Sequence, residues 1–193
     1  FQGCSLGCDG CIARDTWDKT EGQKVDISDL LPWVSTKLSN HSVTGITISG
    51  GEPFQQPDAL LKLLKDLRIL VSVQDNETDI LCYSGYTLHW LQRRFPKHLP
   101  LLDALIAGPY NRNEPKTNPL AGSGNQKIAT FSSLGASRYN TGEQFHAEKK
   151  QLQVSVQGKN LWMVGIPDVA DLDELSRRLE QKGIKLGGVT WRE

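Results

Sequence analysis

The sequence of 193 residues predicts an α/β fold, in which crossover helices cover a parallel sheet. Apolar strand-like segments alternate with segments of helical periodicity, and Gly and Pro punctuate the connections between them. The chain is long enough for one domain with a real core. It has too few strand–helix units for an eight-stranded barrel, which takes about 250 residues. We therefore expect a partial (β/α)6-type barrel, whose first strand precedes the opening FQGC and is largely missing from this chain.

The first elements follow from caps and periodicity. The segment 26–38 predicts a helix entered through Ser28 as its N-cap, with Pro32 still in the first turn. The apolar run Val43 to Ser49 predicts a buried strand, which a Gly- and Pro-containing loop follows. A helix over Pro57 to Leu70 is then indicated by apolar residues at helical spacing and by Pro at its start.

The alternation continues to about residue 108. Asp79 to Ser84 predicts a second strand, 87–95 a second helix, and 101–108 a third strand. Between Pro109 and Gly124 the chain is polar and too long to be a mere connector.

The last third of the chain predicts a different arrangement. Residues 149–166 read as a hairpin around the turn QGKN, and residues 168–184 read as an amphipathic helix that ends at Gly183. We expect residues 1–130 to form the core, and residues 131–193 to form an extension packed on the same domain.

Composition limits the classes of partner. The 22 Lys and Arg residues balance the 22 Asp and Glu residues, so no global field draws in nucleic acid or an anionic membrane. No apolar run approaches the roughly 20 residues that span a bilayer, and no signal peptide is visible. We expect a cytoplasmic protein. Four cysteines do not make a disulfide scaffold, and Cys82 lies in an apolar strand-like run where we expect a small buried hydrophobe.

The other three cysteines are clustered. Cys4, Cys8 and Cys11 are separated by Gly- and Asp-containing segments that do not resemble core, and such a loop can turn its sulfurs toward one centre. A structural zinc site takes four ligands, and the four histidines are scattered singly. An iron–sulfur cluster usually takes four thiolates, so three would leave one iron without a protein ligand. An open metal position is a catalytic feature, which indicates that something else binds there.

The spacing Cys4-x3-Cys8-x2-Cys11 resembles the cluster motif of radical S-adenosylmethionine enzymes. The resemblance implies a 4Fe-4S cluster whose open iron is chelated by S-adenosylmethionine. It also implies that cleavage of this cofactor yields a 5′-deoxyadenosyl radical, which abstracts hydrogen from a substrate. Cofactor chemistry of this kind explains why no Ser-His-Asp or paired-carboxylate arrangement is present.

A second stretch, ISGGEPFQQ, resembles the glycine-glycine-glutamate motif of the same superfamily. Gly50 and Gly51 would let the backbone approach the ligand closely, and Glu52 would accept a hydrogen bond from the methionine ammonium group. Pro53 would shape the turn. The motif follows a predicted strand, and ligands bind at the carboxyl ends of parallel strands.

Further stretches indicate the branch of the superfamily. CIARDTWD, which contains Trp17 and Asp18, resembles pyruvate formate-lyase activating enzyme. FQGC, the glycine before the third cysteine, CYSGYT and DALIAGPYN…GSGNQKI resemble anaerobic ribonucleotide reductase activating enzymes. The resemblance implies that Ser84 contacts the ribose or carboxylate of the cofactor, and that Asn125 and Gln126 form an NQ element. Many superfamily members hold adenine with an aromatic residue before the third cysteine, which Gly10 cannot do.

Three functions are compatible with these residues. The leading hypothesis is an activase that abstracts hydrogen from a polypeptide and installs a glycyl radical, with flavodoxin or ferredoxin as the electron donor. The alternative is a radical maturase of a ribosomally made precursor peptide, for which the extension offers a binding place. A non-catalytic iron–sulfur or zinc interaction module is opposed by the Gly-Gly-Glu motif. A partial barrel has an open side, so we expect a polypeptide to enter there toward Cys8 and Glu52, between the loop Pro109 to Gly124 and the extension beyond Lys150.

Overall fold

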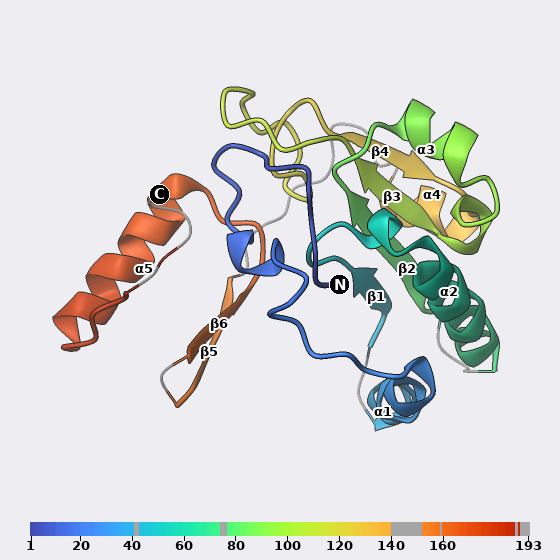
Figure 1. Ribbon diagram of the computed structural model, residues 1–193, viewed down its shortest axis with the longest axis horizontal. Coiled ribbons are helices and arrows are strands. Elements are labelled where there is room, and N and C mark those ends of the chain that lie inside the picture. The colour runs from blue at the N-terminus through green and yellow to red at the C-terminus, as the bar shows by residue number, and fades with distance from the viewer. Residues whose placement is uncertain (41–42, 74–76, 140–151, 159, 188, 190–193) are drawn as a thin grey trace.

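A computed structural model describes residues 1–40, 43–73, 77–139, 152–158, 160–187 and 189. Its centre is a four-stranded sheet in the order β1-β2-β3-β4, and a separate two-stranded sheet pairs β5 with β6 (Figure 1). The strands of the larger sheet are β1 (Gly45–Ile48), β2 (Asp79–Ser84), β3 (Ala104–Ala107) and β4 (Lys127–Thr130). The predicted α/β class is therefore confirmed.

The sheet is parallel only in part. β1, β2 and β3 run parallel, as predicted, whereas β4 pairs antiparallel with β3, with Ile106 opposite Ile128. β4 was not predicted from the sequence, and it runs antiparallel because a long loop, rather than a crossover helix, returns the chain beside β3. The described residues place four strands in this sheet, so a six-stranded partial barrel is not confirmed.

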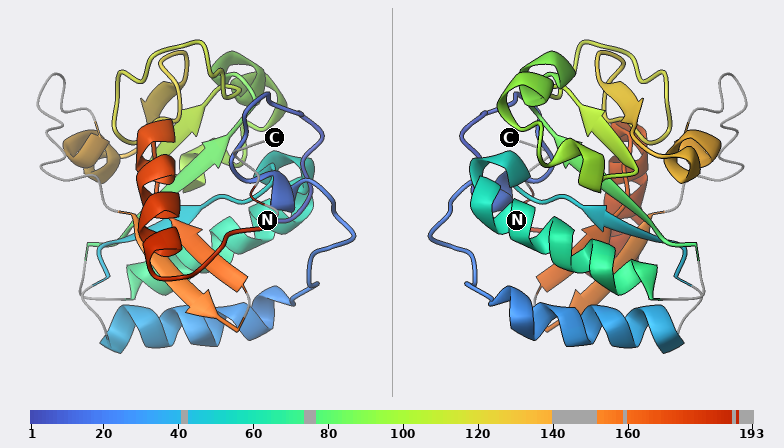
Figure 2. Two further views of the ribbon diagram at one scale, coloured as in Figure 1. Left: turned by 90° about the vertical axis from the view of Figure 1, so that its left-hand side faces the viewer. Right: turned by 90° about the vertical axis from the view of Figure 1, so that its right-hand side faces the viewer.

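Helices lie on both sides of the sheet. The helical elements are η1 (Arg14–Thr16), α1 (Ile27–Asn40), η2 (Pro53–Gln55), α2 (Pro57–Ser72), α3 (Leu88–Arg94), η3 (Leu99–Leu101), α4 (Ser133–Tyr139) and α5 (Val169–Gln181). α2 and α3 lie on one side of the sheet, and α5 with the β5–β6 hairpin lies on the other (Figures 1 and 2). The predicted helices are confirmed, and α4 is an additional short helix. No helix among the described residues has both the length and the apolarity to cross a bilayer.

The main core lies between the sheet and α2. Leu60, Leu64 and Leu67 recur at helical spacing on α2, and all are buried against Ile80 and Cys82 of β2. Cys82 is fully buried, which confirms its prediction as a core residue. Alternate residues of β2 and β3 point to the other face, where Leu81 and Ile106 belong to a smaller cluster.

The start of α1 differs from the prediction. The helix begins at Ile27, and Asp26 caps it by accepting hydrogen bonds from the backbone N–H and the hydroxyl of Ser28, at 2.8 and 2.7 Å. Ser28 therefore lies inside the first turn rather than at the N-cap, and Pro32 lies beyond the first turn. Asp and Ser are comparable N-cap residues, so sequence alone did not separate the two positions.

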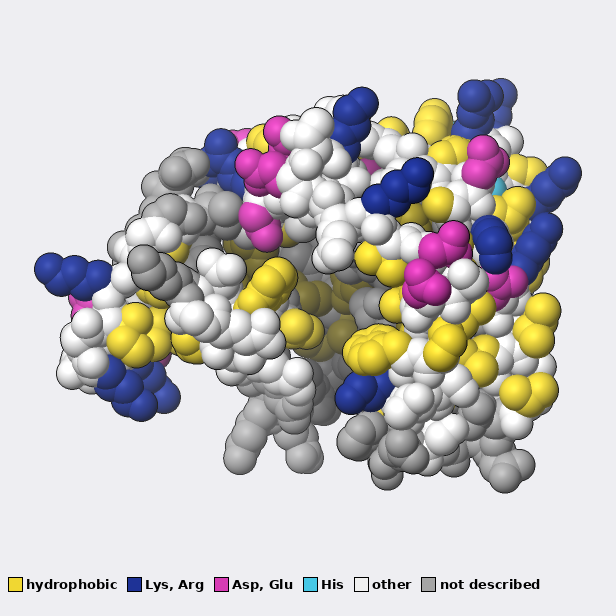
Figure 3. Space-filling model, turned by 60° about the horizontal axis from the view of Figure 1, so that its bottom comes forward, with side chains coloured by type: hydrophobic (Ala, Val, Ile, Leu, Met, Phe, Trp, Pro, Cys, Tyr) yellow, Lys and Arg dark blue, Asp and Glu magenta, His cyan; other side chains and the backbone are white. Residues whose placement is uncertain are grey.

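The C-terminal segment has the predicted hairpin and helix. β5 (Gln153–Gln157) pairs antiparallel with β6 (Asn160–Val164), while residues 149–151 and residue 159 of the predicted hairpin lie outside the described residues. α5 starts with a capping box between Asp168 and Asp171, and Gly183 follows its end with a φ of 76°. Figure 3 shows a hollow with hydrophobic side chains between this segment and the side that carries α1.

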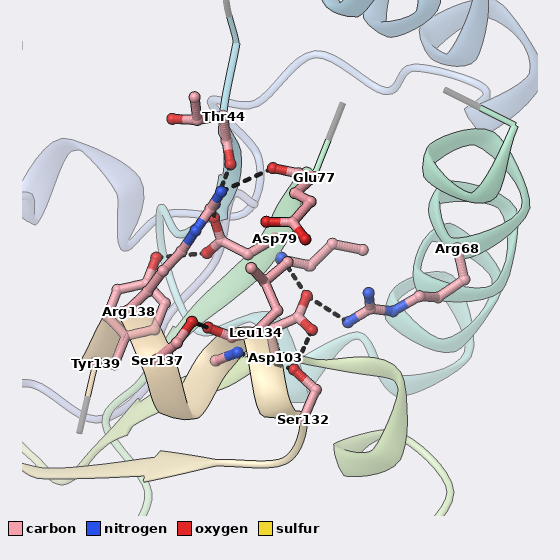
Figure 4. A network of polar contacts seen from close by, with 12 residues as sticks. Thr44, Arg68, Glu77, Asp79, Asp103, Ser132, Leu134, Ser137, Arg138 and Tyr139 are labelled. Carbon is pink, nitrogen blue, oxygen red and sulfur yellow. Dashed lines mark hydrogen bonds and ion pairs between the residues drawn. The ribbon is translucent and has the colours of Figure 1, made fainter. Parts of the chain in front are cut away.

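Two buried carboxylates tie together the amino-terminal ends of β2 and β3 (Figure 4). Asp103 accepts hydrogen bonds from the backbone N–H of Ile80 and from the guanidinium of Arg68, both at 2.7 Å, and also from the hydroxyl of Ser132. Asp79 pairs with Arg138 in the same way at the neighbouring strand. These pairs hold the end of the sheet that lies opposite the carboxyl ends of its parallel strands.

We predict that Asp103→Ala destabilises the protein by about 3–5 kcal/mol, because it leaves the partly buried Arg68 and a buried N–H without their acceptor. Asp66→Ala removes the carboxylate of the exposed pair with Lys62 and should cost at most about 1 kcal/mol. Urea unfolding at equilibrium measures both free energies. Equal losses for the two variants would contradict a special role for Asp103.

Candidate active site

The carboxyl ends of the three parallel strands and the N-terminal loop surround one cavity of about 160 Å³. A single buried water needs roughly 10–15 Å³, so the cavity has room for a group of many atoms. Its lining comes from the N-terminal loop (Cys4, Leu6, Cys8, Cys11, Thr16, Trp17), the turn after β1 (Ser49, Gly50, Gly51, Glu52), the end of β2 (Tyr83, Ser84, Gly85) and the segments beyond β3 (Gly108, Tyr110, Gln126).

The three clustered cysteines all line this cavity, and each is half-buried. Positive φ angles at Gly7 and Gly10, of 62° and 74°, turn the loop between the thiols. Burial raises the pKa of Cys4 and of Cys8 above the ordinary value, only partly offset by backbone N–H groups of Leu6 and Tyr110 respectively. Both thiols therefore stay protonated at neutral pH while no metal is bound, and binding of a metal would release their protons.

Backbone hydrogen bonds fix this loop against the end of β1. The N–H groups of Gly51 and Glu52 donate to the carbonyls of Phe1 and Gly3, at 2.7 and 2.9 Å. A Cβ atom at Gly50 would lie 2.1 Å from the carbonyl oxygen of Phe1, and one at Gly51 would lie 2.3 Å from that of Gly3. The structure therefore shows a steric requirement for glycine that the sequence did not indicate: only glycine at these positions leaves room for the backbone of residues 1–3.

The segment that follows the cysteines folds back against the first residues of the chain. Gly3 and Cys4 donate their N–H groups to the carbonyls of Thr16 and Trp17, at 2.7 and 3.0 Å. Trp17 lines the cavity, whereas Asp18 turns away and accepts hydrogen bonds from Thr20. Of these two residues, only Trp17 belongs to the site.

Glu52 is almost completely buried, at 1% exposure, and three donors hold its carboxylate. Oε1 accepts hydrogen bonds from the N–H of Phe54 and the hydroxyl of Ser84, at 3.0 and 2.9 Å, and Oε2 accepts one from the N–H of Gly85 at 2.7 Å. Burial raises the pKa of Glu52, and these donors oppose the rise. The site thus presents an oriented carboxylate that is favourable for a cation.

Ser84 orients Glu52 as well as lining the cavity. Its hydroxyl donates to Glu52 and accepts a hydrogen bond from the N–H of Tyr86 at 3.1 Å. Pro53, which the sequence placed with the cofactor-binding residues as the shaper of the turn, is buried at the first position of η2 and does not line the cavity.

The NQ element holds the long loop. Gln126 lines the cavity, accepts hydrogen bonds from the N–H groups of Gly122 and Ser123, and donates to the carbonyl of Gly108 at 2.9 Å. Asn125 donates to the carbonyl of Pro109 at 2.8 Å and does not line the cavity.

The long loop itself also reaches the site, which the sequence did not predict in detail. Tyr110 lines the cavity, and the hydroxyl of Tyr83 donates to the carbonyl of Leu120 at 2.8 Å. The guanidinium of Arg112 lies where a side chain at Gly10 would start, with Nε 2.7 Å from the position of its Cβ, and it pairs with Asp9 at 2.9 Å. Gly85 and Gly108 were also missed, although both follow parallel strands, where ligands are expected.

The donor set fits an iron–sulfur cluster better than a single ion. Within the described residues, no group of three or more His, Cys, Asp or Glu side chains is arranged to hold one metal ion. A cubane cluster offers a separate iron to each thiolate, so its three ligands need not converge on one point. Three half-buried thiols around one cavity meet that requirement.

Comparison with known proteins agrees with this geometry. Residues 1–129 match the family described as 4Fe-4S single cluster domain. Over 126 residues the chain is 28% identical to the anaerobic ribonucleoside-triphosphate reductase-activating protein of Enterobacteria phage T4, covering 65% of this chain and 78% of that protein. The protein of the same name from Vibrio cholerae is 27% identical over 136 residues, covering 67% of this chain and 83% of the relative.

A third match is local. Over 60 residues the chain is 43% identical to pyruvate formate-lyase 1-activating enzyme of Escherichia coli, which covers 30% of this chain and only 24% of that enzyme. No solved structure matches the chain significantly. These matches confirm the resemblance to activating enzymes that CIARDTWD, FQGC, CYSGYT and DALIAGPYN…GSGNQKI indicated.

The environments of the four thiols predict different reactivity. In reduced, metal-free native protein, iodoacetamide should alkylate Cys4, Cys8 and Cys11 and spare Cys82, because burial removes Cys82 from solvent and raises its thiol pKa. Peptide mass spectrometry reads the labelled positions, and labelling in urea supplies the control in which all four react. Alkylation of native Cys82 at the rate of Cys4 would contradict the structure.

Proposed function

The chain belongs to the 4Fe-4S single cluster domain family, and from this we propose that it is a radical S-adenosylmethionine activase that acts on a polypeptide. The observation that carries the proposal is the single cavity that brings the three cysteines and Glu52 together. When bound there, a reduced 4Fe-4S cluster would supply the electron that cleaves S-adenosylmethionine to methionine and a 5′-deoxyadenosyl radical.

Cys4, Cys8 and Cys11 would hold the cluster. Their half-burial supports this role, because a partly dry site protects a cluster while leaving one side open to a second ligand. The N–H groups of Leu6 and Tyr110, which face the sulfurs of Cys4 and Cys8, would stabilise the bound thiolates.

Glu52 would hold the ammonium group of S-adenosylmethionine. Its carboxylate is desolvated and fixed by three donors, so it needs no reorganisation to accept from a cation. Ser84 and Gly85 would keep it in place. Gly50 and Gly51 line the cavity and would let the methionine end lie close to the backbone. Gln126 would hold the wall of the cavity that the segments beyond β3 form. Asn125 would support this wall only indirectly, through its hydrogen bond within the long loop.

The substrate would be a glycyl radical enzyme, in which the activase installs the radical by taking a hydrogen atom from a glycine. The support is the similarity to activating proteins of anaerobic ribonucleoside-triphosphate reductase and of pyruvate formate-lyase. A second observation is the open hollow beside the sheet (Figure 3), since a polypeptide could cover that side itself. We propose that the sheet forms part of a partial (β/α)6 barrel.

A radical maturase of a precursor peptide is the second candidate. The hairpin and α5 lie beyond the family match, which ends at residue 129, and they would offer such a peptide a docking place. We propose that residues 131–193 pack on the same domain as the core. Lys116 of the long loop supports this, because it bonds to the carbonyl of Ile166 and to Asp168, at 2.9 and 2.8 Å. A cytoplasmic location with flavodoxin or ferredoxin as reductant completes the proposal.

One anaerobic assay tests the proposed function. Protein reconstituted with iron and sulfide should hold about four irons per chain, and with S-adenosylmethionine and dithionite it should form 5′-deoxyadenosine that depends on a polypeptide. A glycyl radical enzyme should support it and show a glycyl radical signal, whereas a precursor peptide that supports it would favour the maturase. Stoichiometric zinc with no iron would reject both. Cys8→Ala is the inactive control, and Cys82→Ala should retain its iron.

We predict that Glu52→Ala keeps the iron–sulfur cluster but weakens binding of S-adenosylmethionine by roughly 10- to 150-fold, the effect of losing one charge-assisted hydrogen bond. Equilibrium binding to the reconstituted protein measures it. Asp9→Ala removes an exposed carboxylate of the N-terminal loop; it is the control and should bind within about twofold of wild type. Unchanged binding by the Glu52 variant would remove this residue from the cofactor site.

A further inference from the structure

The outer face of α3 carries one stripe of exposed aromatic and basic side chains. Trp90, Arg93 and Arg94 of α3 and Lys97 just beyond its end, which we call the α3 patch, are all exposed, and Trp90 and Lys97 each lie three or four residues from both arginines. Between residues 85 and 102 the sequence has these three Lys and Arg residues and no Asp or Glu, although the whole chain has no net charge. The patch is therefore a local positive field on a neutral molecule.

Within the part of the chain that the structure describes, the positive charges of the patch take part in no ion pair. None of the ion pairs formed among the described residues includes Arg93, Arg94 or Lys97. Exposed cations that need no partner for the fold are free to meet an acidic partner.

A chain of contacts joins the α3 patch to the cysteine loop. The ring of Trp90 stacks on that of Tyr86, with centroids 4.1 Å apart. The side-chain amide of Gln55 donates to the hydroxyl of Tyr86 at 3.1 Å and to that of Ser5 at 2.8 Å, and its oxygen accepts from the N–H of Ser5 at 3.1 Å. Ser5 follows Cys4 directly, so a protein seated on the patch would lie beside the cysteine loop.

We propose that the α3 patch docks the electron donor of this enzyme, a small acidic protein that carries a flavin or an iron–sulfur group. The proposal rests on the proposed function, which needs one electron from outside for each cleavage. In docking no bond forms or breaks, and the donor then loses one electron to the centre held by the cysteines. α3 covers the helical side of the sheet, opposite the side with the hairpin and the hollow where the polypeptide would enter (Figures 1 and 3).

The size of the patch agrees with this kind of partner. α3 has seven residues and is therefore only about 10 Å long. Complexes of electron-transfer proteins are small and weak, and charge complementarity steers their association. Nucleic acid would need a wider basic surface than three cations on a neutral protein.

Binding of an oxidised bacterial flavodoxin and of an acidic ferredoxin to the reconstituted full chain tests the proposal. Wild-type protein should bind one of them, and more weakly as salt rises from 0.05 to 0.3 M. The double variant Arg93→Glu/Arg94→Glu should bind at least about tenfold more weakly at low salt. Lys65→Glu/Lys182→Glu changes the net charge equally at exposed positions outside the patch, and should stay within about threefold of wild type.

Three results would overturn the proposal: binding of neither donor by wild type, equal losses in the two double variants, or unchanged binding in the arginine variant. A fourth would be that Arg93→Glu/Arg94→Glu slows the dithionite-driven reaction with a polypeptide as much as it weakens donor binding, since the patch would then dock the substrate. Donor binding is measured without S-adenosylmethionine. If the chain binds a donor through the patch but forms no 5′-deoxyadenosine, only the proposed function is contradicted. If the chain is normally active with dithionite but binds no donor through the patch, only the docking proposal is contradicted.

Discussion

The contact between the first three residues and the turn after β1 is the constraint on which the site depends. Gly51 and Glu52 donate their N–H groups to the carbonyls of Phe1 and Gly3, which fixes the cysteine loop over the carboxyl ends of the parallel strands. Any side chain at Gly50 or Gly51 would collide with that backbone. The same short turn therefore positions the three thiols and, one residue later, the carboxylate that faces them.

Glu52 shows how the fold uses burial for chemistry. An ionised carboxylate at 1% exposure opposes folding, and burial accordingly raises its pKa. Three hydrogen bonds from Phe54, Ser84 and Gly85 offset part of this cost and fix both oxygens. At a pH below the ordinary pKa of a glutamate, Glu52 is protonated in both the folded and the unfolded protein, and its burial as a charge costs nothing. As pH rises from there toward the raised pKa of the folded protein, Glu52 lowers the free energy of unfolding progressively. A bound ammonium group would relieve this cost.

Local patterns predicted much of the fold and the site. Asp79–Ser84 was predicted to the residue because an apolar run with clear ends makes a central strand, and the spacing of three cysteines placed them around one centre. β4 was missed because its pairing depends on where the long loop returns. The contacts of Tyr110 with the site and of residues 1–3 with Gly50 join distant parts of the chain, and no local pattern encodes them.

The central proposal is that Cys4, Cys8 and Cys11 would hold a 4Fe-4S cluster and leave one of its irons without a protein ligand, in the cavity that Glu52 also lines. Mössbauer spectroscopy of protein reconstituted with ⁵⁷Fe tests it most directly. Adding S-adenosylmethionine should change the isomer shift of one iron in about four and leave the other three unchanged, and Glu52→Ala should need more cofactor for the same change. A spectrum in which S-adenosylmethionine alters no iron, or alters all of them equally, would contradict the claim.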